Sequence, residues 1–320
     1  MFRQFLIATV LAQSITLSVF AAGPQAGQIK NLVTFGDSYT DVDAHADGGT
    51  VWPVFAAREG NFNLYPFAKA GAMCSSKLIP HAAPPVVESQ LPKYFAEKDN
   101  GSLSALTPDN TMYTLWIGTN DVGPKGLLTG KQAAGVTLVD TVSCAVNWVQ
   151  TLYNSGARNF IFQNMVPLEA APLYLVNSYP NHYWTAPRNT TEWHQFVKEL
   201  TNSGNAIARL KLQLLAPTLS GAHIGFFDSH ALFTDIYNHP KVYLNGTAPL
   251  NVTGAVHSCI YKEGENVNDT GVCTIAKGTD QDSFFWYDEL HPSVQTERVV
   301  AKAMSDVILR KSEQWITWLS

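Results

Sequence analysis

The sequence predicts an α/β fold, a three-layer α/β/α sandwich built on a mainly parallel, doubly wound sheet. Short apolar runs rich in β-forming residues recur along the 320 residues, and a longer, more polar stretch follows each of them. Several of these stretches place apolar residues three and four positions apart, as a helix does. Strands and helices that alternate in this order form parallel sheets, because each helix returns the chain to the same end of the sheet.

The expected strands are short apolar runs. They cover residues 31–35, 63–67, 112–117, 159–163 and 224–227. Ligands of doubly wound sheets bind where loops leave the carboxyl ends of the strands. Polar motifs that directly follow these runs are therefore the first candidates for a functional site.

The expected helices follow from apolar spacing. The longest covers residues 190–215 and is stopped by Pro217. Its apolar positions are Trp193, Phe196, Val197, Leu200, Ile207, Leu210 and Leu214. A second helix covers 129–153 and ends before Gly156. A third covers 293–311, with an inward stripe of Val300, Met304, Val307 and Ile308.

The chain is expected to consist of a leader and one large domain. Residues 1–21 carry Arg3, then a largely apolar run, then small residues, which is typical of a secretory signal peptide. Residues 22–320 are enough for a single domain. Within it, residues 238–284 hold two cysteines and three glycosylation sequons without clear periodicity. We expect a disulfide-pinned surface insertion there.

Charge and hydropathy limit the possible partners. Lys and Arg number 21 against 26 Asp and Glu, a formal charge of −5 that becomes −6 once Arg3 is removed with the leader. Such a chain is not expected to bind nucleic acid or an anionic membrane. No segment after the leader approaches about 18 uninterrupted apolar residues. We therefore expect a secreted, extracellular monomer without stable membrane association.

Cysteines and sequons support the secretory route. The four cysteines, an even number without a Cys-x-x-Cys pair, are expected to form disulfides rather than a zinc site. Three pairings are possible; proximity in sequence favours Cys259 with Cys273, which leaves Cys74 with Cys144. The glycosylation candidates are Asn100, Asn189, Asn245, Asn251 and Asn268.

Ser38 is the candidate nucleophile. It sits in the Gly-Asp-Ser turn directly after the first predicted strand, so its hydroxyl is expected to project where a substrate can reach it. A serine hydroxyl attacks only when a base accepts its proton and a third group orients that base. Asp288 and His291, three residues apart before the final helix, can supply both functions.

Attack on an ester carbonyl also requires donors for the oxyanion that forms. Two stretches that follow predicted strands fit this need. In Gly118-Thr119-Asn120-Asp121, the Asn120 amide can point at the oxyanion, and in the stretch around Gly71 a backbone N–H can come close.

Taken in this order, these blocks resemble the SGNH hydrolases, also called the GDSL family of esterases and lipases. The resemblance covers residues 35–292 and implies a flavodoxin-like α/β/α sandwich. It implies that Ser38, His291 and Asp288 form a catalytic triad, and that Ser38 N–H, Gly71 and Asn120 form the oxyanion hole. The Gly-x-Ser-x-Gly motif of α/β-hydrolases is absent around Ser38.

The chain departs from the family pattern in two blocks. Tyr39 replaces the leucine of the name motif, and Lys69-Ala70 replaces the more usual asparagine and aliphatic residues before Gly71. Trp52-Pro53 after the first block resembles fungal carbohydrate esterase family 16. That resemblance implies a secreted acetylesterase that deacetylates plant cell-wall sugars without a cofactor.

Two other functions stay open. The first is a lipase or phospholipase with the same catalytic residues and a long, apolar acyl pocket. The second is not an enzyme but a secreted carbohydrate-binding protein whose site is inactive. Tryptophans such as Trp52, Trp116, Trp184 and Trp286 can stack on sugars, although tryptophan is more often core and Trp116 lies inside a predicted strand.

Other polar clusters are weaker candidates. Asp228-Ser229-His230 contains an acid, a serine and a base, but consecutive side chains point in different directions, so we expect strand-end capping. Asp37 and Asp121 are expected to hold loops. The histidines without metal-ligand spacing include His45, His81, His182, His194 and His257, and we expect no metal.

Overall fold

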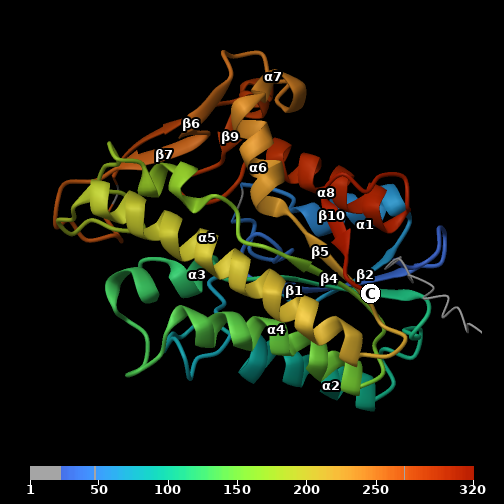
Figure 1. Cartoon of the computed structure of the whole chain (residues 1–320). Helices are drawn as coiled ribbons and strands as arrows, with labels where there is room; N and C mark the ends of the chain where they lie inside the picture. The colour runs from blue at the N-terminus through green and yellow to red at the C-terminus, as the bar shows by residue number, and fades with distance from the viewer. Residues whose placement is uncertain (1–22, 47, 270) are drawn as a thin grey trace, which may run out of the picture.

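The computed structural model describes residues 23–46, 48–269 and 271–320. The predicted signal peptide, residues 1–21, lies outside the described residues. The central sheet consists of β1 (Asn31–Gly36), β2 (Asn63–Pro66), β3 (Thr111–Trp116), β4 (Asn159–Gln163), β5 (His223–Phe227) and β10 (Ile316–Trp318). The strand order is β10-β5-β4-β3-β1-β2, with β1 to β5 parallel and β10 antiparallel to β5 (Figure 1). The order 2-1-3-4-5 is that of flavodoxin-like folds.

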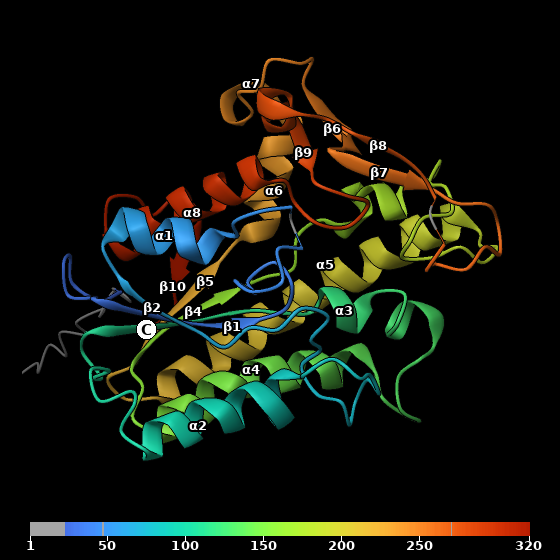
Figure 2. The ribbon, with the colours of Figure 1, turned by 180° about the vertical axis from the view of Figure 1, so that it is seen from behind.

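Helices cover both faces of this sheet. One face carries α1 (Trp52–Gly60), α6 (Ser229–Asn238) and α8 (Val294–Ile308), and the other carries α2 (Leu91–Asp99), α4 (Leu138–Asn154) and α5 (Thr190–Leu215) (Figures 1 and 2). Side chains alternate between the two faces along each strand. Leu32 joins the core under α1 and α8, whereas Val33 and Phe35 join the core under α2 and α4. The predicted three-layer α/β/α fold is confirmed.

The remaining elements lie around the carboxyl end of the sheet and in the predicted insertion. They are α3 (Thr119–Val122), α7 (Pro240–Tyr243), β6 (Asn251–Ala255), β7 (His257–Ile260), β8 (Val272–Ile275) and β9 (Phe284–Trp286). β6 pairs with β9, and β7 pairs with β8 in an antiparallel hairpin. The region 238–284 is therefore more ordered than its lack of periodicity suggests. Its strands are three to five residues long and partly exposed, so they carry no clear alternation.

All five predicted strands are present, with ends that differ from the prediction by at most one residue. The prediction for the second helix was wrong at its start, because α4 begins at Leu138 rather than at residue 129. Gly130 and Gly135 adopt φ values of 70° and 77°, which break a helix, and the Asp140 carboxylate accepts the Thr137 N–H to set the new start.

The longest predicted helix has the expected bounds, and its buried face is in part the predicted one. Val197 is buried, and Trp193, Leu200 and Ile207 are half-buried against the core. The buried side chains of α5 are Val197, Thr201, Gly204, Ala208 and Leu212. Phe196, Leu210 and Leu214 are exposed. Small residues line this face where α5 packs on α4 and on the loop after β4. A Cβ added at Gly204 would lie 2.6 Å from Met165 Cε and 3.4 Å from Leu138 Cδ1 of α4. The third helix buries the predicted stripe, Val300, Met304, Val307 and Ile308.

Strand register brings the candidate motifs to one edge of the sheet. Gly36, the last residue of β1, pairs with Trp116, the last residue of β3, while Thr34 pairs with Pro66 at the end of β2. The loops that carry Ser38, Gly71 and Asn120 therefore leave the sheet side by side.

Candidate active site

Ser38 lies in a turn that begins at Gly36, a position where only glycine fits. Gly36 has φ 147°, and a Cβ added there would lie 2.2 Å from the Trp116 carbonyl oxygen. The buried Gln90 side chain holds both backbone groups of Gly36: its Oε1 accepts the N–H at 3.1 Å and its Nε2 donates to the carbonyl at 2.8 Å. The turn is thus fixed from both sides, and Ser38 is 6% exposed.

Residues next to Ser38 tie this turn to the last loop of the site. The Tyr39 hydroxyl donates to the Leu290 carbonyl at 2.8 Å, so this tyrosine connects the loop of Ser38 to the loop of His291. The Asp37 carboxylate accepts the Tyr39 N–H at 3.2 Å, as expected for a turn residue. Burial raises the pKa of Asp37 to about 7.

His291 connects Ser38 to Asp288. Its Nε2 lies 2.8 Å from Ser38 Oγ, although the two residues are 253 positions apart. Its Nδ1 lies 3.0 Å from Asp288 Oδ2 and 3.2 Å from Oδ1. The structure thus brings together the three residues predicted to form the triad, in the order that nucleophile, base and orienting acid require.

Asp288 is fixed by its own turn. Its Oδ1 accepts the Leu290 N–H at 2.8 Å and the His291 N–H at 2.7 Å. Burial by itself raises the pKa of the carboxyl, but the charge of His291 and the hydrogen bonds from His291 and Tyr183 outweigh it, and the pKa of Asp288 falls below its ordinary value. Asp288 is therefore ionised wherever His291 can act as a base.

The predicted oxyanion donors line the same cavity as the triad. Ser38, Gly71, Asn120 and His291 all border a cavity of about 180 Å³. Gly71 has φ 73°, in the left-handed region that favours glycine. The Asn120 amide donates to the Ala72 carbonyl at 2.9 Å, and since the amide carries two protons, the second is available to the cavity.

Buried acids hold the loops of Gly71 and Asn120 in place. Asp121 Oδ1 accepts the Cys74 N–H at 3.1 Å, which links the Asn120 loop to the Gly71 loop. Cys74 in turn forms a disulfide with Cys144 of α4. Asp41 Oδ2 accepts the Ala70 N–H at 2.8 Å from the other side. Burial raises the pKa of Asp121 to about 7.

Tyr183 is a further residue of the site that no sequence motif predicts. Its hydroxyl lies 2.6 Å from Asp288 Oδ2 and 2.7 Å from His291 Nδ1, and its side chain lines the cavity. No local motif marks it, because 105 residues separate it from Asp288.

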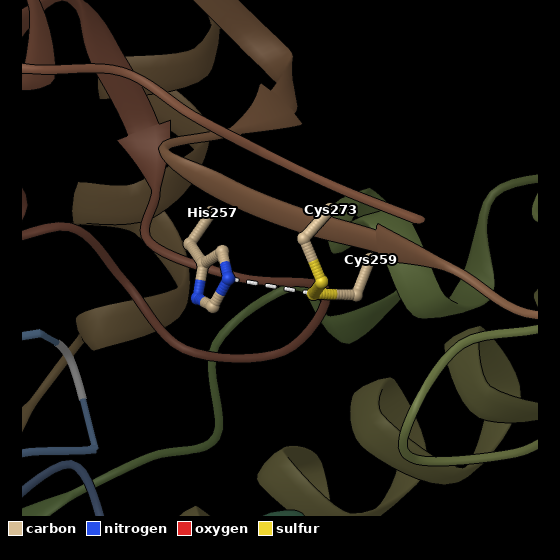
Figure 3. A group of neighbouring side chains, drawn as sticks. All are labelled: His257, Cys259 and Cys273. Atoms are coloured by element: carbon tan, nitrogen blue, oxygen red, sulfur yellow. Dashed lines mark hydrogen bonds between the residues drawn. A yellow bond between two sulfur atoms is a disulfide. The ribbon is translucent and has the colours of Figure 1, made fainter. Parts of the chain in front are cut away.

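The second disulfide lies away from the triad, in the insertion. Cys259 pairs with Cys273 across the β7–β8 hairpin, so the two disulfides match the pairing that proximity favoured. His257 Nε2 lies 3.4 Å from Cys259 Sγ (Figure 3). These residues have the spacing of a metal-binding group. Because the two sulfurs are bonded to each other, they offer no thiolate to a metal.

The glycosylation candidates lie outside the cavity. Asn100, Asn189, Asn245 and Asn268 are exposed, and Asn251 is half-buried. Asn189 Oδ1 accepts the Thr191 and Glu192 N–H groups as the N-cap of α5. Asn251 Oδ1 accepts two backbone N–H groups in its own turn.

The competing polar cluster and most of the tryptophans serve the fold. Asp228 Oδ1 accepts the Ala231 N–H at 3.0 Å and caps α6, as expected. Trp52, Trp116 and Trp286 are buried and cannot stack on a sugar. Trp184 is half-buried and packs on Trp193, with ring centroids 5.1 Å apart.

Curated proteins that resemble this chain include two fungal acetylesterases. An acetylesterase from Hypocrea jecorina is 29% identical over 342 residues, covering 94% of this chain and 95% of that protein. An acetylesterase from Thermothelomyces thermophilus is 24% identical, covering 95% of this chain and 97% of that protein. A thermolabile hemolysin from Vibrio parahaemolyticus is 23% identical over 88% of this chain and 65% of its own length.

Among solved structures, a catalytic mutant of an acetylxylan esterase from Geobacillus stearothermophilus is similar, with 13% identity and a TM-score of 0.44, covering 90% of this chain and 96% of that one. None of the helices in the described part of the chain has the length and apolar character needed to cross a membrane.

The GDSL-like lipase/acylhydrolase family matches residues 32–304. The chain therefore belongs to this family and is a carboxylic ester hydrolase.

Proposed function

We propose that the chain is a secreted serine esterase of one catalytic domain that removes acetyl groups from small carbohydrates, plant cell-wall oligosaccharides foremost. The reaction proceeds through an acyl-enzyme on Ser38, with His291 as base and Asp288 as the acid that orients it. The observation that carries this proposal is the 2.8 Å contact between Ser38 Oγ and His291 Nε2, with Asp288 at 3.0 Å from Nδ1.

In the first half of the reaction, Ser38 Oγ attacks the ester carbonyl carbon while its proton passes to His291 Nε2. The carbonyl oxygen becomes an oxyanion, for which the Ser38 and Gly71 N–H groups and the Asn120 amide are the donors. As the tetrahedral intermediate collapses, the ester C–O bond breaks, and His291 gives its proton to the departing sugar hydroxyl.

In the second half, water attacks the acetyl-serine. His291 accepts a proton from the water, and a second oxyanion forms in the same hole. As this intermediate collapses, the bond between Ser38 Oγ and the acetyl carbon breaks, and His291 gives its proton to Oγ, which releases acetic acid and restores the Ser38 hydroxyl. Asp288 stays ionised throughout, because its hydrogen bonds and the charge of His291 hold its pKa low. It stabilises the imidazolium that forms twice per turnover.

The cavity favours a short acyl group. Its volume of about 180 Å³ is below the range of roughly 300–1,000 Å³ typical of drug-sized ligands. Small residues, Ala46, Ala70 and Gly71, border it, and the polar side chains of His81 and Lys125 form another part of its wall. Such a space suits an acetyl group beside a polar sugar better than it suits a long acyl chain.

Two activity measurements test the proposal. The first compares nitrophenyl acetate, butyrate and octanoate, and we expect kcat/KM to fall as the chain lengthens. A preference for octanoate would favour a lipase or phospholipase on the same residues. The second follows acetate release from acetylated xylo-oligosaccharides, which should exceed release from an aryl acetate at equal concentration.

The remaining alternative is a secreted carbohydrate-binding protein without catalysis. The Ser38→Ala variant should lose esterase activity and keep the thermal stability of the unaltered protein. Binding of glycans by an unaltered protein that hydrolyses no ester would favour the binding protein instead. The two disulfides and the exposed sequons support secretion, and their test is recovery of glycosylated protein, cleaved near residue 21, from the culture medium.

A further inference from the structure

The hydroxyl of Tyr183 lies between the acid and the base of the proposed triad. It is 2.6 Å from Asp288 Oδ2 and 2.7 Å from His291 Nδ1. The direct contacts from Nδ1 to the Asp288 carboxylate are longer, 3.0 and 3.2 Å. Among these three oxygens, the phenolic oxygen is therefore the one nearest to the imidazole Nδ1.

Chemistry fixes the direction of the hydrogen bonds. Burial, followed by the negative charge of Asp288, raises the pKa of Tyr183 well above its ordinary value, so the hydroxyl keeps its single proton. It donates that proton to Asp288 Oδ2, which as an ionised carboxylate can only accept. The phenolic oxygen then has lone pairs free for the Nδ1–H of His291.

This arrangement of hydrogen bonds requires that the neutral His291 ring carries its proton on Nδ1, which is also the tautomer that can act as a base toward Ser38. His291 Nε2 must be unprotonated to receive the proton of Ser38, so the neutral ring carries its proton on Nδ1. That proton faces both the Tyr183 oxygen and the Asp288 carboxylate. The chain of contacts therefore runs from Ser38 through His291 and Tyr183 to Asp288, beside the direct contact between His291 and Asp288.

A tight turn positions Tyr183. Asn181 and Trp184 exchange two backbone hydrogen bonds of 3.0 and 2.9 Å, and Asn181 Oδ1 accepts the Tyr183 N–H at 3.1 Å. Asn181 is fully buried. The His182 ring lies against the Tyr183 ring, with centroids 3.8 Å apart. The turn thus holds the Tyr183 hydroxyl beside Asp288 and His291.

We propose that Tyr183 is a positioning residue of the esterase reaction, which couples Asp288 to His291 and stabilises the imidazolium formed when Ser38 attacks. This inference rests on the proposed function. No proton leaves the tyrosine: the proton from Ser38 stays on His291 Nε2 until the leaving alcohol takes it, and Tyr183 only accepts a hydrogen bond from Nδ1–H. The proposed catalytic unit is therefore a serine, a histidine and an aspartate bridged by a tyrosine.

The Tyr183→Phe variant tests this role, because it keeps the ring and removes only the hydroxyl. We expect kcat for an aryl acetate to fall about 10- to 100-fold, the factor that a hydrogen bond to a charged group is worth. KM should change little. The acid limb of the rate profile should move to lower pH, because the imidazolium loses its nearest acceptor and forms less readily.

Tyr179→Phe is the matched control. The Tyr179 hydroxyl donates to Glu289 Oε1 at 2.9 Å, so this tyrosine also serves a carboxylate, but that carboxylate belongs to the residue after Asp288. Loss of this hydroxyl should leave kcat within about threefold and the acid limb unmoved. Melting temperatures of both variants show whether either change disturbs the fold.

Incorporation of 3-fluorotyrosine at position 183 covers the case in which the phenylalanine variant fails to fold. The fluorinated phenol keeps the shape and the hydroxyl but is a weaker acceptor, so the acid limb should again move to lower pH with a smaller loss of kcat. A pH profile identical to that of the unaltered enzyme would overturn the inference.

The outcomes separate this inference from the proposed function. If Tyr183→Phe retains kcat, or loses kcat without a shift of the acid limb, while Ser38→Ala is inactive, then Tyr183 only packs and the triad proposal stands. If Ser38→Ala hydrolyses esters at the unaltered rate, the proposed function fails whatever Tyr183 does.

Discussion

Replacing Asn120 with alanine removes the side-chain donor that faces the cavity beside Ser38. In the resting structure the amide gives one proton to the Ala72 carbonyl at 2.9 Å, and the other is free for an oxyanion. Because the oxyanion exists only in the transition state and the intermediates, the loss should appear in kcat and leave KM nearly unchanged.

The size of the effect follows from one missing donor. Loss of a side-chain donor from an oxyanion hole lowers kcat by about 10²–10³, on the order of 3–4 kcal/mol. The cost to folding should be smaller, about 1 kcal/mol, because Asn120 is half-buried and the Ala72 carbonyl loses one neutral hydrogen bond. The assay is steady-state hydrolysis of nitrophenyl acetate with purified protein, beside a thermal melt.

Asn205→Ala is the control for this variant. Asn205 Nδ2 also donates to a backbone carbonyl, that of Met165, at 2.8 Å, but Asn205 does not border the cavity of Ser38. It should lose stability without a large loss of kcat. A kcat for Asn120→Ala within about threefold of the unaltered enzyme, or an equal loss of kcat in Asn205→Ala, would show that the Asn120 amide is not a donor to the oxyanion.

The remaining predictions concern stability. Gly36→Ala should destabilise the fold by on the order of 2–4 kcal/mol, because the new Cβ meets the Trp116 carbonyl at 2.2 Å; an unchanged denaturant midpoint contradicts it. Asp121 has a pKa of about 7 when folded against an ordinary 3.8, so the folded protein keeps a proton that the unfolded chain releases. Stability should therefore fall as pH rises from about 4 to about 7, by up to the order of 4 kcal/mol from this residue. Asp121→Asn should flatten melting temperature against pH, and an unchanged slope argues against it. Removing the Cys74–Cys144 disulfide by a double alanine change should cost about 4 kcal/mol for its separation of 70 residues, and equal unfolding free energies would count against this value.

The sequence predicted the sheet well because its parallel strands are short runs rich in apolar residues, which stand out from their more polar surroundings. Strands β1, β3, β4 and most of β5 are buried, whereas β2 is partly exposed. Helix α5 has a clear N-cap in Asn189 and a clear stop in Pro217. The short edge strand β10 and helices α1, α2 and α6 were not identified. They are short, between three and ten residues, and they depend on packing against the sheet.

The site could be predicted only where a residue belongs to a local motif. Ser38, Gly71 and Asn120 each follow a strand, and Asp288 and His291 are three residues apart, so the order of these blocks and their resemblance to a known family single them out. Tyr183 belongs to a loop with no such spacing. Its role depends on a turn built by Asn181 and on a distant carboxylate, which only the folded chain brings together.

Covalent labelling identifies the nucleophile of this esterase. A fluorophosphonate should inactivate the unaltered enzyme with one adduct per chain, and peptide mass spectrometry should place that adduct on Ser38. Ser38→Ala should take up no label and hydrolyse no ester, and His291→Ala should label much more slowly, because the base that activates Ser38 is missing. An adduct on a different serine in an inactivated enzyme, or full ester hydrolysis by Ser38→Ala, would contradict the account.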